Sequence, residues 1–573
     1  MKSPDCDNTS LCNNLISSLA DSIPAVQSFN GRRAAIGAKI STLRTSALSD
    51  LSDHSDHPLS GEILKSIVET LSTALTLCLH CRSPDPPAGK LQTQSEISIV
   101  ATALDKHLAD ADLLLKSGLL VQRRFNHVTG RDGEHAMGVG DEDEEEEKTM
   151  TRTESTSLRI ECRSLVTRLQ IGTAEQRNIA MESLVHLLYG DDKNVLGAVA
   201  QGVVPVLVRI LESSGCHVAK EKAVSAIARI SAVESSRCVL IGEGLLLLNH
   251  LTRALESGRG VAKEKACIAL QSLTLTKENS MAVGSRGGVA SLLEICRVGT
   301  PSAQASAAGV LRNLAAVDAI RHWFLEERGV VILRRLCTSG TASAQENAIG
   351  CVRNLAAGDD QETKQVIFRD FWIEGIKNYW DSQTNSLEPA VGLFRHLATD
   401  SGIADQLVSS GFLPRIISAT RNPSSATRTE AAKSLHSLVT FGKARKQIVE
   451  SECLTQLLGM LDAKRIAEKD AAVKALASIV SLFPESRKIV KKNEKGISDL
   501  VRLLNPQVID VEKKYPVLIL LTFSHSKKNR RRMTDAGARG FLSKLVDMNV
   551  EGAKKLLGNL DKCSVWGVFL QRN

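Results

Sequence analysis

The chain has 573 residues, of which 43% are apolar but only 3% aromatic, and its formal net charge is +8. A core of Leu, Val, Ile and Ala favours helices packed on helices over a β-sandwich or barrel, and the scarcity of aromatic side chains argues against binding of single-stranded nucleic acid. The modest basic excess permits acidic partners without requiring them.

The N-terminus and the cysteines indicate a soluble protein of a reducing compartment. No apolar segment follows Met1 behind a basic start, and no apolar run approaches the roughly 18 residues of a membrane span. The 13 cysteines show no disulfide spacing and lie mostly within apolar helical patterns. We therefore expect a protein of the cytoplasm, the nucleus or both, without a membrane span.

Residues 1–125 are predicted to form an N-terminal helical bundle, with helices at about 11–20, 23–50, 60–81 and 92–125. Within the third helix, Cys78 and Cys81 form a lone C-x-x-C pair. His54 and His57 could complete a zinc site, but no second C-x-x-C exists and the cysteines lie on an apolar helix. This favours buried thiols, and we expect no metal and no cofactor.

A linker is predicted at residues 126–157. It is rich in Gly and charged residues and contains seven consecutive acidic residues at 141–147. Like charges in such a run repel one another, so we expect the linker to be disordered.

From residue 158 to residue 573 the sequence is periodic. Val310–Ala316 recurs as Cys351–Ala357 and again as Leu393–Thr399. The residues that align with the Asn of the first copy form a ladder with steps of 41 to 44 residues, and a last, degenerate copy follows at Asn559. The regular members of the ladder are His186, Arg229, Ser272, Asn313, Asn354, His396, Ser437, Ser478 and Thr522. A period of this length is typical of stacked helical repeats.

A second recurring sequence element precedes each copy, and its clearest example is Gly202–Leu211. The Gly, which tolerates positive φ, is expected to end one helix; an amphipathic helix and then an Ala-rich third helix follow. The pattern predicts about nine to ten units. The aromatic-rich Phe368–Trp380 is off-pattern, and Pro516 is expected to kink a third helix.

The opening Gly-x-Val/Leu-Pro-x-Leu-Val and the closing Leu-Arg-Asn-Leu-Ala-Ala resemble armadillo repeats. The resemblance implies an all-α fold, a right-handed α-solenoid of armadillo repeats preceded by a small helical bundle, in which the third helices line a concave groove. With its N-terminal bundle, the chain resembles plant armadillo-only proteins that carry an N-terminal helical domain and no U-box.

The third-helix ladder is the main candidate site. In three consecutive units it holds Arg312 and Asn313, Arg353 and Asn354, and Arg395 and His396. The resemblance implies that the Asn side chains bind the backbone of an extended peptide, while the Arg side chains could pair with carboxylate or phosphate. The alternative is that the Asn residues tie adjacent helices together and the Arg residues are solvated.

Two further basic features accompany the ladder. Nine residues before it lies a second row that is mostly basic and includes Lys220, Lys263, Arg428 and Lys469. A basic cluster, expected in a loop after a third helix, could be a nuclear-localisation signal, a phosphate-binding patch or a chance run; its basic residues are Lys527, Lys528, Arg530, Arg531 and Arg532.

The sequence contains no recognisable catalytic motif, which favours a non-enzymatic scaffold or adaptor that binds an extended acidic or phosphorylated protein segment. We expect protein partners and no small-molecule substrate. One alternative is an accessory or substrate-recruiting subunit of a ubiquitin ligase, although nothing in residues 1–157 matches a U-box. Another is a nuclear transport adaptor, although Gly309, Gly350 and Gly392 stand where importin α has Trp. The acidic run could also fold back onto the basic groove.

Overall fold

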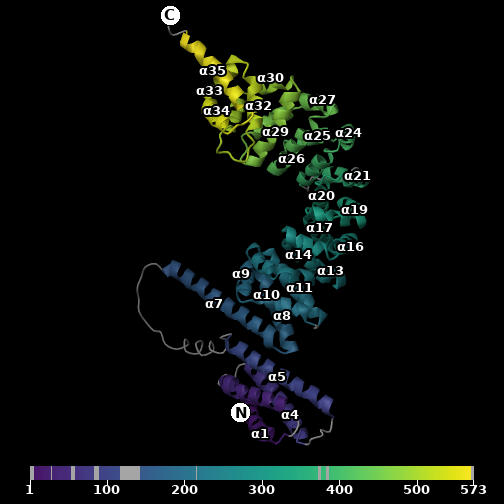
Figure 1. The fold of residues 1–573 in the computed structure, drawn as a ribbon, viewed down its shortest axis with the longest axis vertical. Coiled ribbons are helices and arrows are strands. Elements are labelled where there is room, and N and C mark those ends of the chain that lie inside the picture. The colour runs from purple at the N-terminus through teal and green to yellow at the C-terminus, as the bar shows by residue number, and fades with distance from the viewer. Residues whose placement is uncertain are drawn as a thin grey trace. The chain divides into compact units, whose positions relative to one another are not determined.

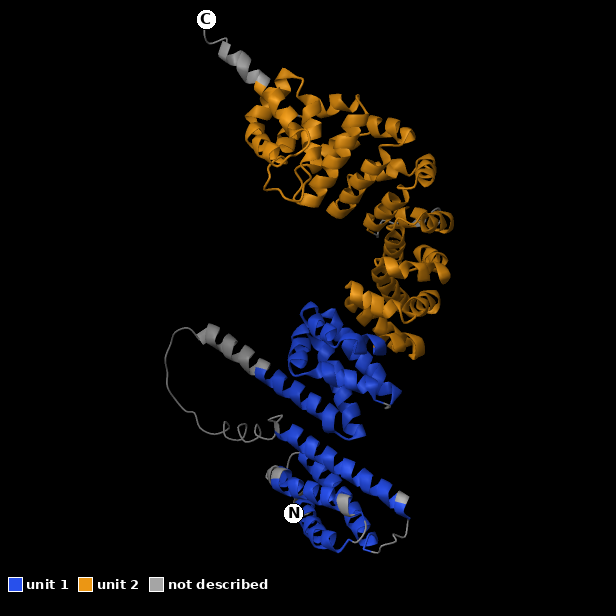
Figure 2. Ribbon diagram, in the orientation of Figure 1, with its two compact units in different colours: residues 1–250 blue, residues 251–573 orange. Residues whose placement is uncertain are grey.

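The computed structural model describes most of the chain, and it divides into two compact units, residues 1–250 and residues 251–573 (Figure 2). Among the described residues, all regular elements are helices (Figure 1). The described ranges are 5–26, 29–52, 58–82, 89–116, 142–213, 216–371, 376–381 and 386–569.

The N-terminal part of unit 1 is a helical bundle. Its central helix, α4 (Pro58–His80), packs between α1 (Asp5–Ser22) and α5 (Lys90–Lys116). Shorter elements complete it: η1 (Ile23–Ala25), α2 (Asn30–Thr42), η2 (Leu43–Ala47) and α3 (Leu48–Ser52). The core is aliphatic, as the composition predicts, and includes Leu19, Leu43, Leu64, Ile67, Leu71 and Leu104. Residues 117–125, expected to continue the last helix, lie outside the described residues.

Helix α4 corrects the expectation that no segment is long and apolar enough to span a membrane. Its segment Leu59–His80 is 22 residues long and has a mean hydropathy of 1.2 in its most apolar part, so it is long and apolar enough to cross a membrane. In the structure α4 is amphipathic, because Ile67 and Leu71 are buried in the bundle while Lys65 and Glu69 are exposed. Length and composition alone therefore do not separate this core helix from a membrane span.

The rest of unit 1 begins the repeats. Helix α7 (Glu142–Ile171) packs against α8 (Ala174–Gly190), and α8 packs against α11 (His217–Ala232). Between and after these lie α9 (Asp192–Ala200), α10 (Val203–Glu212), η3 (Glu234–Ser236) and α12 (Arg237–Gly242). Residues 142–157, predicted to be disordered, are helical here, because the high helix propensity of Glu outweighs the repulsion between neighbouring carboxylates. Residues 126–141 of the predicted linker lie outside the described residues.

Unit 2 is built from successive helix triads of about 42 residues, in which a short first helix leads to a second and a third helix. Helix α13 (Gly244–Ser257) spans the boundary between the units. The first helices are α15 (Lys277–Gly284), α18 (Arg321–Glu326), α21 (Gln361–Asp370), α24 (Ser401–Ser409), α27 (Gly442–Glu450), α30 (Ser486–Lys492) and α33 (Lys527–Asp535). The second helices are α16 (Gly288–Val298), α19 (Gly329–Ser339), α22 (Lys377–Asp381), α25 (Leu413–Ala419), α28 (Cys453–Met460), α31 (Glu494–Arg502) and α34 (Ala538–Asp547).

The third helices form the spine of unit 2, since each packs against the next from α14 through α32. They are α14 (Gly260–Leu273), α17 (Pro301–Ala315), α20 (Ala342–Ala356), α23 (Glu388–Leu397), α26 (Ser425–Leu438), α29 (Ile466–Leu482), α32 (Lys514–Phe523) and α35 (Ala553–Phe569). Their buried small residues, such as Ala307, Ala308 and Ala348, permit this close stacking. In Figure 1, α17, α20, α26 and α29 follow the inner side of the curve of unit 2, and α21, α24 and α27 follow its outer side.

In several units the turn before the second helix uses a left-handed residue, as the glycine pattern predicts, but Gly496 of that pattern lies within α31 and has no positive φ. Gly202, Gly411 and Gly537 have φ between 76° and 86°. Two units differ from the prediction by one position: the positive φ belongs to Gly287 and not Gly288, and to Arg328 and not Gly329. In those units the Gly after the turn is buried as the first residue of α16 or α19.

Two local predictions about unit 2 have different outcomes. The off-pattern aromatic segment does have an irregular second helix, the five-residue α22, where the buried Tyr379 donates a hydrogen bond from Oη to the Ser386 carbonyl oxygen at 2.5 Å. The predicted kink at Pro516 is wrong. Helix α32 starts at Lys514, so Pro516 lies in the first helical turn, where a missing N–H interrupts no helical hydrogen bond.

Candidate functional site

Every ladder residue lies on a third helix. In unit 1, His186 lies on α8 and Arg229 on α11. In unit 2, the ladder runs from Ser272 on α14 to Asn559 on α35. Within unit 2, the contacts between successive third helices therefore bring the residues that sequence periodicity selected onto neighbouring rungs of one face.

The ladder Asn side chains tie successive third helices together. Asn313 donates from Nδ2 to the Gln271 carbonyl oxygen at 2.9 Å and to Thr274 Oγ1 at 3.1 Å. Asn354 donates from Nδ2 to the Arg312 carbonyl oxygen at 2.8 Å. These bonds match the structural alternative for the Asn residues.

The ladder arginines are not equivalent. Arg353 Nη1 lies 2.5 Å from Glu388 Oε1, and Arg395 Nε lies 2.8 Å from Glu430 Oε2. Each carboxylate comes from the start of the next third helix, so these arginines are paired within the protein and not simply solvated. Among the residues that the structure describes, Arg312 has no ion-pair partner.

His396 takes the ladder place of Asn in its unit. Its Nε2 lies 2.9 Å from Arg395 Nη2, so the neutral imidazole accepts a hydrogen bond from the guanidinium. Burial, reinforced by the positive charge of Arg395, lowers the pKa of His396 to about 4. The imidazole is therefore an acceptor at neutral pH, which is a role that the Asn oxygen can also play.

Glycine lets the arginine stems lie flat on the next third helix. A Cβ placed on Gly350 would be 2.5 Å from Cδ of Arg312, and one placed on Gly392 would be 2.7 Å from Cδ of Arg353. At two of the three glycines, Gly350 and Gly392, the space over the missing Cβ is thus filled by an arginine side chain from the preceding unit, and at Gly309 it is filled by Gln271. Sequence reasoning noted these glycines but missed that packing role.

The second basic row is mixed in its contacts. Arg428 makes a bidentate pair with Glu468, Nε to Oε1 at 2.6 Å and Nη2 to Oε2 at 3.0 Å, and the Glu468 side chain is only 2% exposed. Lys263 on α14 and Lys469 on α29 are partly exposed, as is Lys220 on α11 of unit 1. Arg428 therefore serves the structure of its repeat, while the three lysines remain candidates for contact with a partner.

Two hollows open on the third-helix face of unit 2. The first, here called the Arg312 hollow, is lined by Arg312, Asn313, Asn354, Lys277, Thr274, Thr276 and Ser280, among others. The second, here called the Tyr515 hollow, is lined by His436, Ser437, Ser478, Ser481, Leu482, Tyr515 and Leu518, among others. Sequence reasoning missed Lys277 and Tyr515 because they lie outside the ladder position.

Tyr515 organises the second hollow. Its ring packs edge-on to the His436 ring, with centroids 6.3 Å apart, and the ammonium groups of Lys474 and Lys514 lie 5.6 Å and 4.9 Å from its centroid. Burial lowers the pKa of His436, whose Nδ1 lies 2.7 Å from Ser478 Oγ. This end of the face combines hydroxyl groups, an aromatic ring and the exposed side chains of Leu482 and Leu518.

The basic cluster lies on a helix and not in the predicted loop. Helix α33 contains all five basic residues, and Asn529 and Met533 between and after them are buried. Arg530 donates from Nη1 to the carbonyl oxygens of Ser524 and His525 at 2.9 and 3.0 Å, at the end of the preceding third helix. Lys527 and Arg531 are exposed. The nuclear-localisation reading stays a prediction, now for a helical segment.

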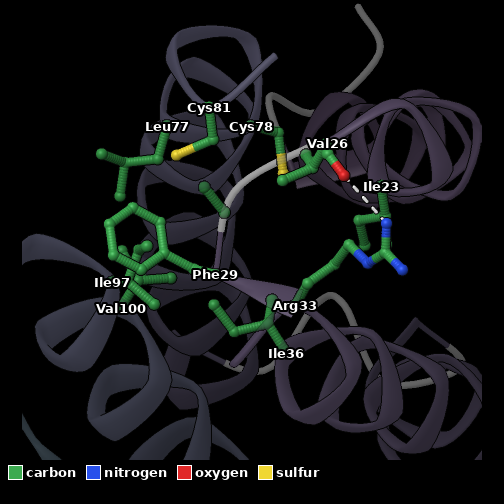
Figure 3. Close-up of a pocket in the computed structure, with 11 residues that line it drawn as sticks. Ile23, Val26, Phe29, Arg33, Ile36, Leu77, Cys78, Cys81, Ile97 and Val100 are labelled. Atoms are coloured by element: carbon green, nitrogen blue, oxygen red, sulfur yellow. Dashed lines mark hydrogen bonds between the residues drawn. The ribbon is translucent and has the colours of Figure 1, made fainter. Parts of the chain in front are cut away.

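The C-x-x-C pair faces an apolar cavity inside the bundle. Figure 3 shows Cys81 beside Leu77 and the ring of Phe29, and Cys78 beside Val26. Burial raises the pKa of the Cys78 thiol, with the nearby Cys81 adding to the shift. Among the described residues, no group of three or more His, Cys, Asp or Glu side chains is arranged to hold a metal ion, and His54 and His57 lie outside them.

Comparisons with known proteins add two findings. Residues 10–119, which hold the bundle, match a family model described as a domain of unknown function, DUF7032. No curated protein matches the chain. A solved engineered protein from the Northeast Structural Genomics Consortium is 23% identical, covers 70% of this chain and 99% of its own, and gives a TM-score of 0.56, which shows the fold alone.

Two designed proteins are also similar. One is a computationally designed armadillo repeat protein for modular peptide recognition, 18% identical, covering 41% of this chain and 98% of its own with a TM-score of 0.37. The other is a designed armadillo repeat protein, 17% identical, covering 48% of this chain and 98% of its own with a TM-score of 0.34. The helix triads and their 42-residue period make the repeat region an all-α solenoid of armadillo-like helical repeats.

Proposed function

We propose that the third-helix face of unit 2 binds an extended segment of a partner protein, and that the chain acts as a non-enzymatic scaffold or adaptor. The observation that carries the proposal is the pair of open hollows on that face, the Arg312 hollow and the Tyr515 hollow. Both are open, the first lined by polar and apolar side chains and the second mainly by apolar surface with several hydroxyl groups, which suits a peptide laid across several helices better than an enclosed small molecule.

The partner segment is proposed to be acidic or phosphorylated. Arg312, which has no ion-pair partner among the described residues, and the neighbouring Lys277 give the first hollow an excess of positive charge. In the second hollow, Lys474 and Lys514 flank Tyr515 but are both paired with Glu512, at 2.6 Å and 3.0 Å, so its selectivity is proposed to rest on the ring and the hydroxyl groups. An anionic group is therefore expected to lie at the Arg312 end of the bound segment.

The geometry disfavours an importin-like mode of binding. A tryptophan array would need the space that Arg312 and Arg353 occupy over Gly350 and Gly392. The order of a helical bundle followed by armadillo-like repeats supports a relation to plant armadillo-only proteins without a U-box. We propose the cytoplasm, the nucleus or both as the location.

The test is a selection from a displayed library of random 12-residue peptides against the full chain. Ser481→Trp fills the Tyr515 hollow from an exposed position, and the matched control Ser409→Trp places the same ring on α24, an exposed first helix outside either hollow. We expect selected peptides to lose at least about tenfold in affinity, or about 1.4 kcal/mol, with the first variant and to keep it with the second. Failure to select any peptide, or equal affinity for both variants, overturns the proposal.

A further inference from the structure

The three ladder arginines differ in their ion pairing. Arg353 and Arg395 are each paired with a Glu that lies 35 residues later in the chain, Glu388 and Glu430. The same offset from Arg312 leads to Asn347. One uncharged residue in an otherwise repeated pair therefore leaves one arginine of the row without its carboxylate.

Asn347 is held in another interaction. Its Nδ2 donates to the Ala305 carbonyl oxygen at 3.0 Å, and the residue is only 8% exposed. It ties α20 to α17, and its side chain is uncharged. The positive charge of Arg312 is thus available on the face, whereas those of Arg353 and Arg395 are largely neutralised by their partners.

The Arg312 side chain is also positioned in advance. Its stem lies against Gly350, where even a Cβ would come within 2.5 Å of Cδ. A side chain whose stem is already packed loses less conformational entropy when its guanidinium binds a ligand. Packing at Gly350 therefore holds the guanidinium at the edge of the Arg312 hollow.

The charges around the hollow favour an anion. Lys277 lines it and, among the described residues, has no ion-pair partner. Asp318 also lines it, but its carboxylate is paired with Arg321 Nη1 at 2.7 Å. The two cations, Arg312 and Lys277, therefore remain uncompensated in a space that also holds the Asn313 carboxamide.

We propose that Arg312 and Lys277 form one anion-binding subsite that receives a phosphate or carboxylate group of the bound segment, and that Arg353 and Arg395 are structural. A guanidinium binds either oxyanion through two parallel N–H donors. The inference rests on the proposed function for the source of the anion. It adds that recognition of the anion is concentrated in one repeat and is not spread along the ladder.

The test measures the rate at which phenylglyoxal modifies each arginine of the full chain, read by peptide mass spectrometry. We expect Arg312 to react faster than Arg353 and Arg395, because a paired guanidinium is shielded. Sodium phosphate, sodium acetate and sodium chloride are compared at equal ionic strength. A labelling rate of Arg312 that is about threefold or more lower in phosphate or acetate, but not in chloride, supports the subsite. Protection by phosphate alone assigns the subsite to phosphorylated segments. Protection by both anions assigns it to acidic segments as well.

Two substitutions exchange the roles of the arginines. Asn347→Glu supplies the missing carboxylate and should slow the labelling of Arg312 and abolish its protection by anions. Glu388→Gln should release Arg353 and give it the reactivity and the anion protection of Arg312. Thermal unfolding checks that each variant folds, and Arg312→Gln provides a second loss of the cation without a new charge.

Equal labelling of Arg312 and Arg353 in the unsubstituted protein, or no protection of Arg312 by either oxyanion, overturns the inference. These results do not depend on peptide selection. If anions protect Arg312 but no peptide can be selected, the anion-binding subsite is supported and the proposed function is overturned. If selected peptides bind equally well to Arg312→Gln, the proposed function is supported and the role of the subsite in peptide binding is overturned.

Discussion

Pairing partners decide what each basic side chain on the third-helix face can do. Arg428, Arg353 and Arg395 have the same charge as Arg312 but share it with carboxylates from the next repeat. The sequence identified all four positions, because the period places them in register. The sequence pattern alone does not distinguish them, because the carboxylate that pairs with Arg353, Arg395 or Arg428 lies 35 to 40 residues later in the chain, on the next third helix.

The Arg428 and Glu468 pair gives a first prediction. Glu468→Gln leaves a guanidinium facing a buried neutral group, so we expect the free energy of unfolding to fall by about 2 kcal/mol, less than for a fully buried pair because Arg428 is partly exposed. Urea unfolding followed by circular dichroism measures the change. The control is Glu485→Gln, whose pair with Arg445 is exposed and screened by solvent, so its loss should leave the free energy of unfolding nearly unchanged. Equal effects of the two substitutions would contradict this account of Arg428.

His396 gives a prediction about pH. Its pKa is about 4 in the folded chain and ordinarily 6.5, so the unfolded chain binds more protons between these values. Stability should therefore fall as the pH is lowered from about 6.5 towards about 4. His396→Asn, which restores the residue of the two preceding rungs, should remove this part of the pH dependence. Urea midpoints of both proteins across this range provide the measurement, and parallel curves would rule out a buried neutral His396.

At the scale of elements, the turns and short helices follow local chemistry that the repeat pattern only partly reveals. The period correctly indicated left-handed turns at Gly202, Gly411 and Gly537. It did not indicate that α33 is helical, because its buried positions Asn529 and Met533 are hidden within a basic run. The period also led to the wrong expectation of a kink at Pro516, because it does not show that α32 begins only two residues earlier, at Lys514.

The turn before α19 can be tested directly. Arg328 is exposed and adopts φ 51°, a conformation that costs a non-Gly residue about 1 kcal/mol. Arg328→Gly should raise the free energy of unfolding, by an amount reduced by the greater flexibility of Gly in the unfolded chain. Arg328→Ala serves as the control, because it removes the same side chain but keeps the strain. A gain of the same size in both variants would show that the side chain, and not the backbone, is responsible.

At the scale of the molecule, the repeat accounts for most of what could be predicted. A period near 42 residues, with Ala at the contact positions of the third helices, is enough to predict stacked helical repeats and the face that the ladder occupies. The hollows could not be predicted in the same way. They depend on residues outside the ladder position, such as Lys277 at the start of α15 and Tyr515 at the start of α32.

The claim that unit 2 binds a segment on its third helices is tested most directly by photo-crosslinking. A selected peptide carrying a benzophenone group is irradiated with the full chain, and the crosslinked residues are mapped by mass spectrometry. The account predicts crosslinks to third helices from α17 to α32, with anionic positions of the peptide nearest Arg312 and Lys277. Crosslinks confined to the first helices α24, α27, α30 or α33 would contradict it.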